Sequence, residues 1–130
     1  MRYILNMNEV QAAQVDRALE LYCRLRIGQW TELIGLCLDT DDDDYCEKRD
    51  FLEQKLLDAR KVAYPTLHGL GHSFGIGKFE DADTAWETHK VLRNKIAWTN
   101  HPEGGITVDF DSPISFRGHE LAKCEAVAEE

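Results

Sequence analysis

Residues 8–27 read NEVQAAQVDRALELYCRLRI and carry the longest helical pattern in the sequence. Val15, Leu19 and Tyr22 lie at positions i, i+4 and i+7, and Ala12 and Leu25 extend the row at each end. This spacing places the apolar side chains on one face of an α-helix. We therefore expect the other apolar stretches of the chain to pack against this helix.

The composition is that of a single globular domain. The chain has 130 residues, of which 43% are hydrophobic and 30% charged, and domains cluster near this length. With 24 acidic against 15 basic residues, the formal net charge is −9, which disfavours nonspecific binding to nucleic acid or to anionic membranes. No apolar run is long enough for a signal peptide or a transmembrane helix. We expect a cytoplasmic protein, because the cysteines are expected to be reduced.

The sequence contains four cysteines, Cys23, Cys37, Cys46 and Cys124, and no CxxC pair. Structural zinc sites use closely spaced ligand pairs, and three of these cysteines lie in predicted helices or at their ends. We therefore expect reduced thiols that behave as small apolar side chains, with no metal site and no cofactor. Disulfides or a metal site are the less favoured alternative.

Start and stop signals divide the rest of the chain into helices. Asn8 is a good N-cap for the first helix, and Gly28 follows its end. Three further helices are predicted over residues 29–38, 43–64 and 81–98. Pro65 ends the third helix, because proline cannot continue the hydrogen-bond pattern.

Two short segments have the character of β-strands. Residues 2–5 are aromatic and β-branched, and residues 106–110 alternate between apolar and polar. We predict that they pair into a two-stranded ribbon, so the fold class is α+β and predominantly helical, with about four helices packed around the first. Residues 1–113 are predicted to form one domain, and residues 114–130 a poorly ordered acidic tail.

Two motifs resemble ligand-binding loops without matching them. Residues 39–44, DTDDDD, have alternate aspartates, but a calcium loop needs glycine at its sixth position and glutamate at its twelfth, where Asp44 and Asp50 stand. A solvated helix start is the favoured interpretation. Residues 68–78, HGLGHSFGIGK, fail the P-loop pattern, because His72 replaces its first glycine and Phe79 follows Lys78.

The same glycine-rich segment fails the dinucleotide pattern, since Phe74 stands where its third glycine is required. His68 and His72 are four residues apart, but the glycines between them argue against a shared helix turn, so metal binding there is disfavoured. No catalytic set is assignable, because one sequence does not show which groups are adjacent in space.

The basic residues of the helices suggest a binding site. Arg24 is near the end of the first helix and Arg93 is in the fourth, and arginine suits carboxylate or phosphate groups. One interpretation is surface pairing, as for Glu20 and Arg24 at i, i+4. The other is an arginine-lined cleft for an anionic ligand, beside the aromatic residues and the glycine-rich segment. Its candidate residues are Tyr22, Arg24, Gln29, Trp30, His72, Ser73, Lys78 and Arg93.

Two segments carry a resemblance to a known group of proteins. Residues 18–30, ALELYCRLRIGQW, resemble an "ALxxYxRxxxGQF" segment of small proteins encoded by bacteriophages and prophages. Residues 98–113, WTNHPEGGITVDFDSP, resemble their C-terminal "PEGGITVDFDxP" segment, and Phe74-Gly75-Ile76 stands where they have "YGI". The resemblance covers most of residues 8–113 and implies no catalytic residue or cofactor. Phe74 replaces the tyrosine, so no hydroxyl role transfers to that position.

This resemblance implies a phage accessory protein, and small proteins of that kind often block host defence. We expect a non-enzymatic protein that antagonises host defence by binding a small anionic, nucleotide-like ligand in the host cytoplasm. One alternative is an acidic protein that inhibits a basic host enzyme through its surface charge. The sequence is also compatible with a homo-oligomer, whichever function applies. Another alternative is a metal-dependent hydrolase.

Overall fold

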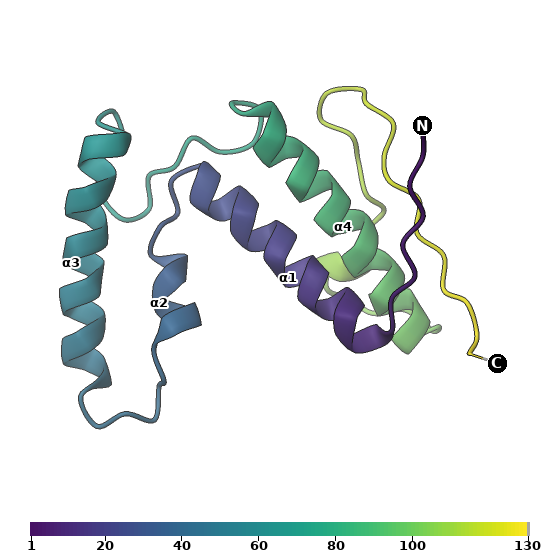
Figure 1. Cartoon of the computed structure of the whole chain (residues 1–130), viewed down its shortest axis with the longest axis horizontal. Helices are drawn as coiled ribbons and strands as arrows, with labels where there is room; N and C mark the ends of the chain where they lie inside the picture. The colour runs from purple at the N-terminus through teal and green to yellow at the C-terminus, as the bar shows by residue number, and fades with distance from the viewer. Residues whose placement is uncertain (130) are drawn as a thin grey trace.

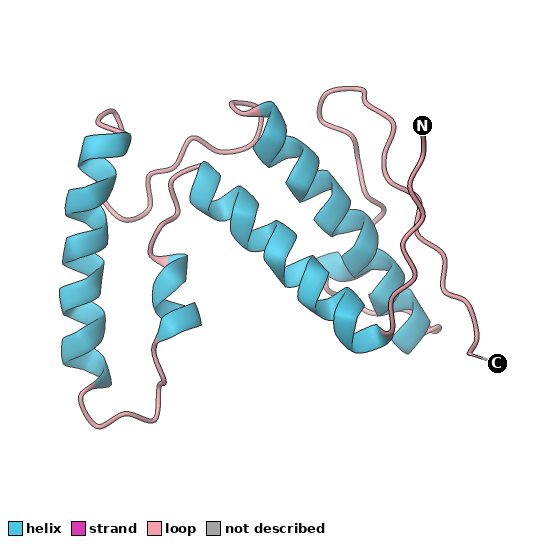
Figure 2. Cartoon of the chain, viewed as in Figure 1, coloured by secondary structure: helices cyan, strands magenta, loops and turns pink. Residues whose placement is uncertain are grey.

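The computed structural model describes residues 1–129 and contains four α-helices and one short 3-10 helix (Figure 1). The elements in order are α1 (Glu9–Arg26), α2 (Glu32–Cys37), α3 (Tyr45–Ala63), α4 (Glu80–Asn100) and η1 (Val108–Phe110). The four helices lie close to the predicted ranges. No β-strand occurs among residues 1–129 (Figure 2), so the predicted α+β class is wrong and the described chain is helical.

α1 begins at the predicted N-cap. Asn8 Oδ1 accepts a hydrogen bond from Gln11 N at 2.9 Å, and Asn8 N donates to Gln11 Oε1 at 3.0 Å. This reciprocal capping box satisfies two backbone donors at the start of the helix. The helix ends before Gly28, whose φ of 100° turns the chain toward α2.

α1 and α4 form the main body by packing against each other in opposite directions (Figure 1). The buried core consists of Cys23 and Ile27 from α1 and Ala82 and Ala85 from α4. Leu19, Phe74, Phe79 and Trp86 pack around it. The buried row of α1 is thus centred on Cys23 rather than on Tyr22, which is 49% exposed at the edge of the contact.

The prediction that three helices pack around α1 is wrong in part. Only α4 covers α1 extensively, and α3 makes no helix contact except with α2. α2 and α3 therefore extend from the α1–α4 pair as an arm, residues 29–64, with α2 between α1 and α3 (Figure 1).

Arg60 holds this arm in place. Its guanidinium is buried, with 3% of the residue exposed, and contacts no carboxylate. Nη1 donates to the carbonyl oxygens of Gly28 at 3.0 Å and of His72 at 3.1 Å, and Nη2 donates to that of Gly69. α3, the turn after α1 and the glycine-rich segment are therefore joined at one side chain. Tyr64 strengthens the junction through its hydroxyl, which donates to the carbonyl of Arg26 at 2.9 Å.

The predicted ribbon is absent because α4 binds one of its two segments. Asn94 Nδ2 donates to the carbonyl oxygens of Asp109 and Asp111, both at 3.0 Å, and Trp98 Nε1 donates to that of Phe110 at 3.2 Å. These side chains take backbone acceptors that a strand would use for its ladder. Residues 108–110 form η1 instead, and residues 2–5 have no strand to pair with.

The glycines of the PEGG sequence allow this close packing. A Cβ on Gly105 would lie 2.5 Å from Phe110 Cε2, and a Cβ on Gly104 would lie 3.0 Å from Trp98 Cη2. The rings of Trp98 and Phe110 meet edge to face, with centroids 5.3 Å apart. The segment therefore works as a packing motif around the end of α4.

The C-terminal segment runs without helix or strand over residues 111–129, and part of it contacts α4. Arg117 Nε donates to the buried Asp83 Oδ2 at 2.6 Å, and Phe116 N donates to Glu87 Oε1 at 2.7 Å. The boundary at residue 113 and the poor order of the tail stay predictions. None of the helices in residues 1–129 combines the length and the apolar character needed to cross a lipid bilayer.

Replacing Arg60 with methionine should destabilise the fold strongly. Arg60→Met leaves the carbonyl oxygens of Gly28, Gly69 and His72 without their donor, which lowers the free energy of unfolding by about 2–3 kcal/mol. Urea unfolding followed by circular dichroism measures the change. Lys61→Met is the matched control, since Lys61 is exposed and next in sequence. Equal stability of the two variants would contradict the role given to Arg60.

Candidate functional site

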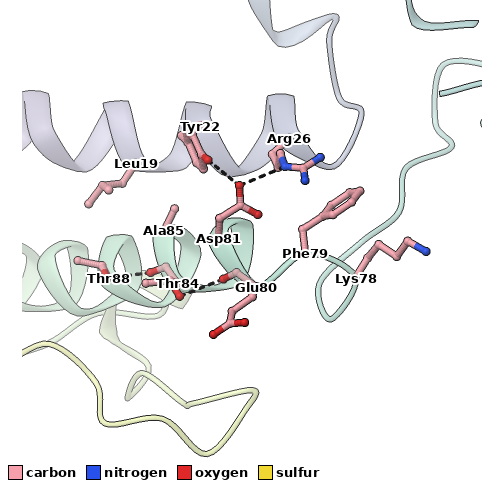
Figure 3. A pocket seen from close by; sticks show the side chains of 10 residues that line it. All are labelled: Leu19, Tyr22, Arg26, Lys78, Phe79, Glu80, Asp81, Thr84, Ala85 and Thr88. Carbon is pink, nitrogen blue, oxygen red and sulfur yellow. Dashed lines mark hydrogen bonds and ion pairs between the residues drawn. The ribbon is translucent and has the colours of Figure 1, made fainter. Parts of the chain in front are cut away.

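One hollow is an open groove of about 880 Å³ between α1 and α4 (Figure 3). Its volume lies in the range of small-molecule sites. Leu19 and Ala85 form its apolar part, and Thr84 and Thr88 line it from α4. The remaining lining residues are aromatic or charged, namely Tyr22, Arg26, Lys78, Phe79, Glu80 and Asp81.

A hydrogen-bond network crosses one end of this groove. Asp81 Oδ2 accepts from the Tyr22 hydroxyl at 2.6 Å and from Arg26 Nε at 3.1 Å (Figure 3). The Arg26 guanidinium carbon lies 3.7 Å from the centre of the Phe79 ring, and its Nη1 donates to the Tyr64 hydroxyl at 3.2 Å. The position of Arg26 is therefore fixed by an acid, a phenol and an aromatic face.

This network changes the acidity of its members. The hydrogen bond from Tyr22 lowers the pKa of Asp81, and the nearby Arg26 lowers it further. The same hydrogen bond, together with the negative charge of Asp81, raises the pKa of Tyr22. At neutral pH the groove thus holds a neutral phenol, a carboxylate and a paired guanidinium.

Lys78 is the cation of the groove without an acidic partner among residues 1–129. Its Nζ lies 5.8 Å from the centre of the Phe74 ring, and it makes no ion pair there. Arg26 is already neutralised by Asp81. Any anion that enters the groove therefore finds its free positive charge at Lys78.

The second hollow is a smaller cavity of about 180 Å³ beneath the glycine-rich segment. It brings together three of the predicted ligand residues, Arg24, Gln29 and Ser73. Its other lining residues are Cys23, Ile27, Gly75, Ile76 and Trp86. Its volume is below the range of sites that hold drug-sized molecules.

Arg24 is already paired inside this cavity. Its Nε and Nη2 donate to Glu20 Oε1 at 3.0 and 2.9 Å, its Nη1 donates to Gln29 Oε1 at 2.9 Å, and Glu32 Oε1 lies 3.7 Å away. The predicted i, i+4 pair of Glu20 and Arg24 is thus confirmed. Two carboxylates around one guanidinium leave this side chain little attraction for an anion.

The other predicted site residues lie outside both hollows. Trp30 donates from Nε1 to the carbonyl of Leu25 at 3.0 Å and meets the Tyr64 ring edge to face. His72 Nδ1 accepts a hydrogen bond from His68 N at 2.9 Å. Arg93 Nε lies 2.9 Å from Asp109 Oδ1 as an ion pair, although its N–H is not directed at that oxygen.

The eight candidates therefore do not share one cleft. Tyr22 and Lys78 line the groove, three others line the small cavity, and Trp30, His72 and Arg93 have structural contacts elsewhere. Sequence reasoning missed Asp81 as a site residue, since its position in the first turn of a helix explained its charge. Asp81 is 59 residues from Tyr22, so no local sequence pattern predicts their hydrogen bond.

Two buried polar side chains of α4 contact neighbouring parts of the chain. His89 is fully buried, and its Nδ1 lies 2.6 Å from Asp16 Oδ1 of α1. Asp83 is 1% exposed, and its Oδ1 accepts from Gly77 N at 2.9 Å. Burial also raises the pKa of the Cys23 thiol to about 11, so this thiol is protonated at neutral pH. His89 Nε2 is buried without a hydrogen-bond partner, and none of these groups lines the groove.

All four cysteines are free. No group of three or more His, Cys, Asp or Glu side chains within residues 1–129 is arranged to hold a metal ion. His68 and His72 stack with ring centroids 6.2 Å apart.

The most acidic segment, here named the acidic loop, is residues 39–50, which comprise the loop before α3 and the first six residues of that helix, at the far end of the arm (Figure 1). It contains seven acidic residues against Lys48 and Arg49, and all seven acidic side chains are exposed. Lys48 pairs with Asp42 at 3.5 Å and Asp44 at 3.3 Å. The loop therefore accounts for five of the nine excess negative charges of the chain.

No protein-family model matches the sequence, and comparisons with curated proteins and with solved structures found no match. What the protein binds must therefore be inferred from the geometry of the two hollows and of the acidic loop.

Removing the charge of Asp81 should lower the pKa of Tyr22 toward its ordinary value of 10.0. Asp81→Asn keeps an acceptor for the phenol but removes the negative charge that opposes its ionisation. Nuclear magnetic resonance of ring-labelled tyrosine follows the titration. Glu80→Gln removes the neighbouring charge, which makes no contact with Tyr22, and should leave its pKa nearly unchanged. The assignment fails if both variants shift the pKa equally.

Proposed function

We propose that this chain is a non-enzymatic binding protein that acts on a basic protein partner through its acidic loop. The concentration of charge in residues 39–50 carries this proposal, because charge complementarity guides association and selects partners. No observation on the described residues favours the metal-dependent hydrolase, so binding is proposed in place of hydrolysis.

The position of the acidic loop on α3 supports this function. Arg60 fixes the base of α3 to the turn after α1, and the acidic loop lies at the other end of that helix (Figure 1). Four consecutive aspartates repel one another, and a solvated loop at a helix start accommodates them. A partner that supplies lysine or arginine relieves this repulsion on binding.

The resemblance to phage-encoded proteins gives the proposal a biological setting. In that setting the chain is an accessory protein that antagonises host defence in the host cytoplasm, and its partner is a basic host protein. Masking such a protein requires a surface of complementary charge and no catalytic group.

Neutralising the acidic loop should weaken partner binding. We expect wild-type protein to recover a basic protein from a bacterial lysate at low salt, and to release it at about 1 M salt, where the Debye length is about 3 Å. Asp41, Asp42, Asp43 and Asp44 changed together to Asn should weaken binding by about tenfold or more, at about 0.3–0.5 kcal/mol for each exposed pair. Titration of the recovered protein measures the affinity.

The matched control removes four charges elsewhere. Glu103, Glu120, Glu125 and Glu129 are exposed and lie outside the arm, and changing all four to Gln should reduce binding much less. If both quadruple variants bind equally, net charge and not the acidic loop attracts the partner.

A second candidate is binding of a small anionic, nucleotide-like ligand in the groove. The unpaired charge of Lys78 favours it, as does the aromatic face of Phe79 in the same groove. Arg26 and Asp81 neutralise each other there, so a single lysine would have to attract the anion.

Calorimetry against nucleotides and cyclic nucleotides tests this candidate. Wild-type protein should bind at least one of them, and Lys78→Gln should weaken binding by about fivefold or more. Lys55→Gln, an exposed change on α3, should have no effect. Loss with Arg24→Ala but not with Lys78→Gln would assign the anion to the small cavity, and absence of binding would remove the candidate.

A further inference from the structure

The small cavity beneath the glycine-rich segment joins an apolar wall to polar groups with unused hydrogen-bonding capacity. Ile27, Ile76 and the ring of Trp86 form that wall, together with the buried thiol of Cys23. Burial raises the pKa of this thiol to about 11, so it carries no charge at neutral pH. The cavity shares no lining residue with the groove between α1 and α4, and it is therefore a separate site.

Gln29 and Ser73 supply the polar groups of the cavity. Gln29 Oε1 accepts a hydrogen bond from Arg24 Nη1 at 2.9 Å, which orients the side-chain amide. Gln29 Nε2 and Ser73 Oγ have no hydrogen-bond partner among residues 1–129, and both residues are half-buried. An amide oxygen has a second lone pair. Gln29 thus offers a donor and an acceptor side by side to a molecule in the cavity.

The charges around the cavity disfavour a charged ligand. Arg24 lines the cavity, with Glu20 Oε1 at 2.9 Å and Glu32 Oε1 at 3.7 Å from its guanidinium nitrogens. Two carboxylates against one guanidinium leave an excess negative charge, which repels an anion. A cation meets Arg24 and Lys90, which lie 5.7 and 5.6 Å from the centre of the Trp86 ring. The ligand that suits this cavity is therefore uncharged.

The volume of the cavity limits the size of that ligand. A protein cavity of about 150 Å³ binds benzene, so about 180 Å³ accommodates one six-membered ring with small substituents. Glutamine amides pair with base edges that place a donor beside an acceptor. We propose that this cavity binds an uncharged pyrimidine ring, with its edge on the Gln29 amide and its faces against the apolar wall.

Titration of the full chain with uracil tests this proposal. Uracil carries adjacent N–H and C=O groups on one ring, and benzene has a ring of the same size without them. Nuclear magnetic resonance follows the side-chain amide of Gln29 and the indole N–H of Trp86. Uracil should shift both signals saturably. Benzene should bind about tenfold more weakly or less, because it leaves Gln29 Nε2 unpaired.

Gln29→Glu separates the contact with the ring edge from the fold. The variant keeps an oxygen for Arg24 and replaces the amide donor with a carboxylate oxygen, so uracil binding should weaken by about tenfold or more. Gln14→Glu adds the same charge at an exposed position of α1 and should leave the affinity unchanged. Ser73→Ala removes one hydroxyl and should weaken binding by about threefold. Circular dichroism verifies that the helices persist.

Four results would overturn the proposal. The first is the absence of saturable shifts with uracil, and the second is equal affinity for uracil and benzene, which would make the cavity apolar only. The third is wild-type affinity in Gln29→Glu, or in Ser73→Ala where Gln29→Glu does not fold. The fourth is tighter binding of uridine monophosphate than of uracil, which would assign an anion to the site. These results leave the acidic loop unaffected, because residues 39–50 do not line the cavity.

Discussion

A buried arginine bonded to carbonyl oxygens is the interaction on which the arrangement of this molecule depends. Arg60 brings a full positive charge into the protein and meets no acid, so the dipoles of Gly28, Gly69 and His72 must balance its loss of hydration. Positive φ angles of 100° at Gly28 and 74° at Gly69 allow both of these residues to turn their backbones sharply near the side chain. Arg60 thereby fixes the relative positions of α3, the turn after α1 and the glycine-rich segment.

This junction also determines where α4 starts. Phe74 N donates to the carbonyl of Ile27 at 2.9 Å, and Ile27 directly precedes Gly28, whose carbonyl binds Arg60. The glycine-rich segment therefore places Phe74, and Phe79 directly after it, against the core residues Cys23 and Ile27. The groove between α1 and α4 begins at Lys78 and Phe79, so its position follows from the same contacts.

The helices were predictable because their signals are local. Asn8 with Gln11, the apolar rows and Pro65 each act within a few residues, and the observed ends agree closely with them. The ribbon failed because strand pairing requires a partner, and Asn94 and Trp98 bind the backbone of the second segment first. Arg60 is placed among the polar residues of α3 by its sequence position, and nothing there reveals that it is buried.

The site was less predictable than the fold because arginine pairs with whichever acid is near. Glu20 lies one turn from Arg24 and the pair followed from spacing, whereas Asp109 reaches Arg93 only through the chain reversal after α4. Tyr22 and Asp81 are 59 residues apart, and their hydrogen bond results from the packing of α1 on α4. Local sequence therefore identifies the charged residues but not the acids that neutralise them.

The two buried carboxylates of α4 have a consequence for synthesis of the chain. Asp83 and Glu87 receive hydrogen bonds from Arg117 and Phe116, which the ribosome adds about thirty residues later. Until then Glu87 lacks this partner and Asp83 has only the N–H of Gly77, so both carboxylates keep part of their hydration, because a carboxylate without full pairing resists burial. The helix pair can meet early, but its outer side closes only after residues 116 and 117 have been added, so a nascent chain stalled before residue 116 keeps that side open to chaperones.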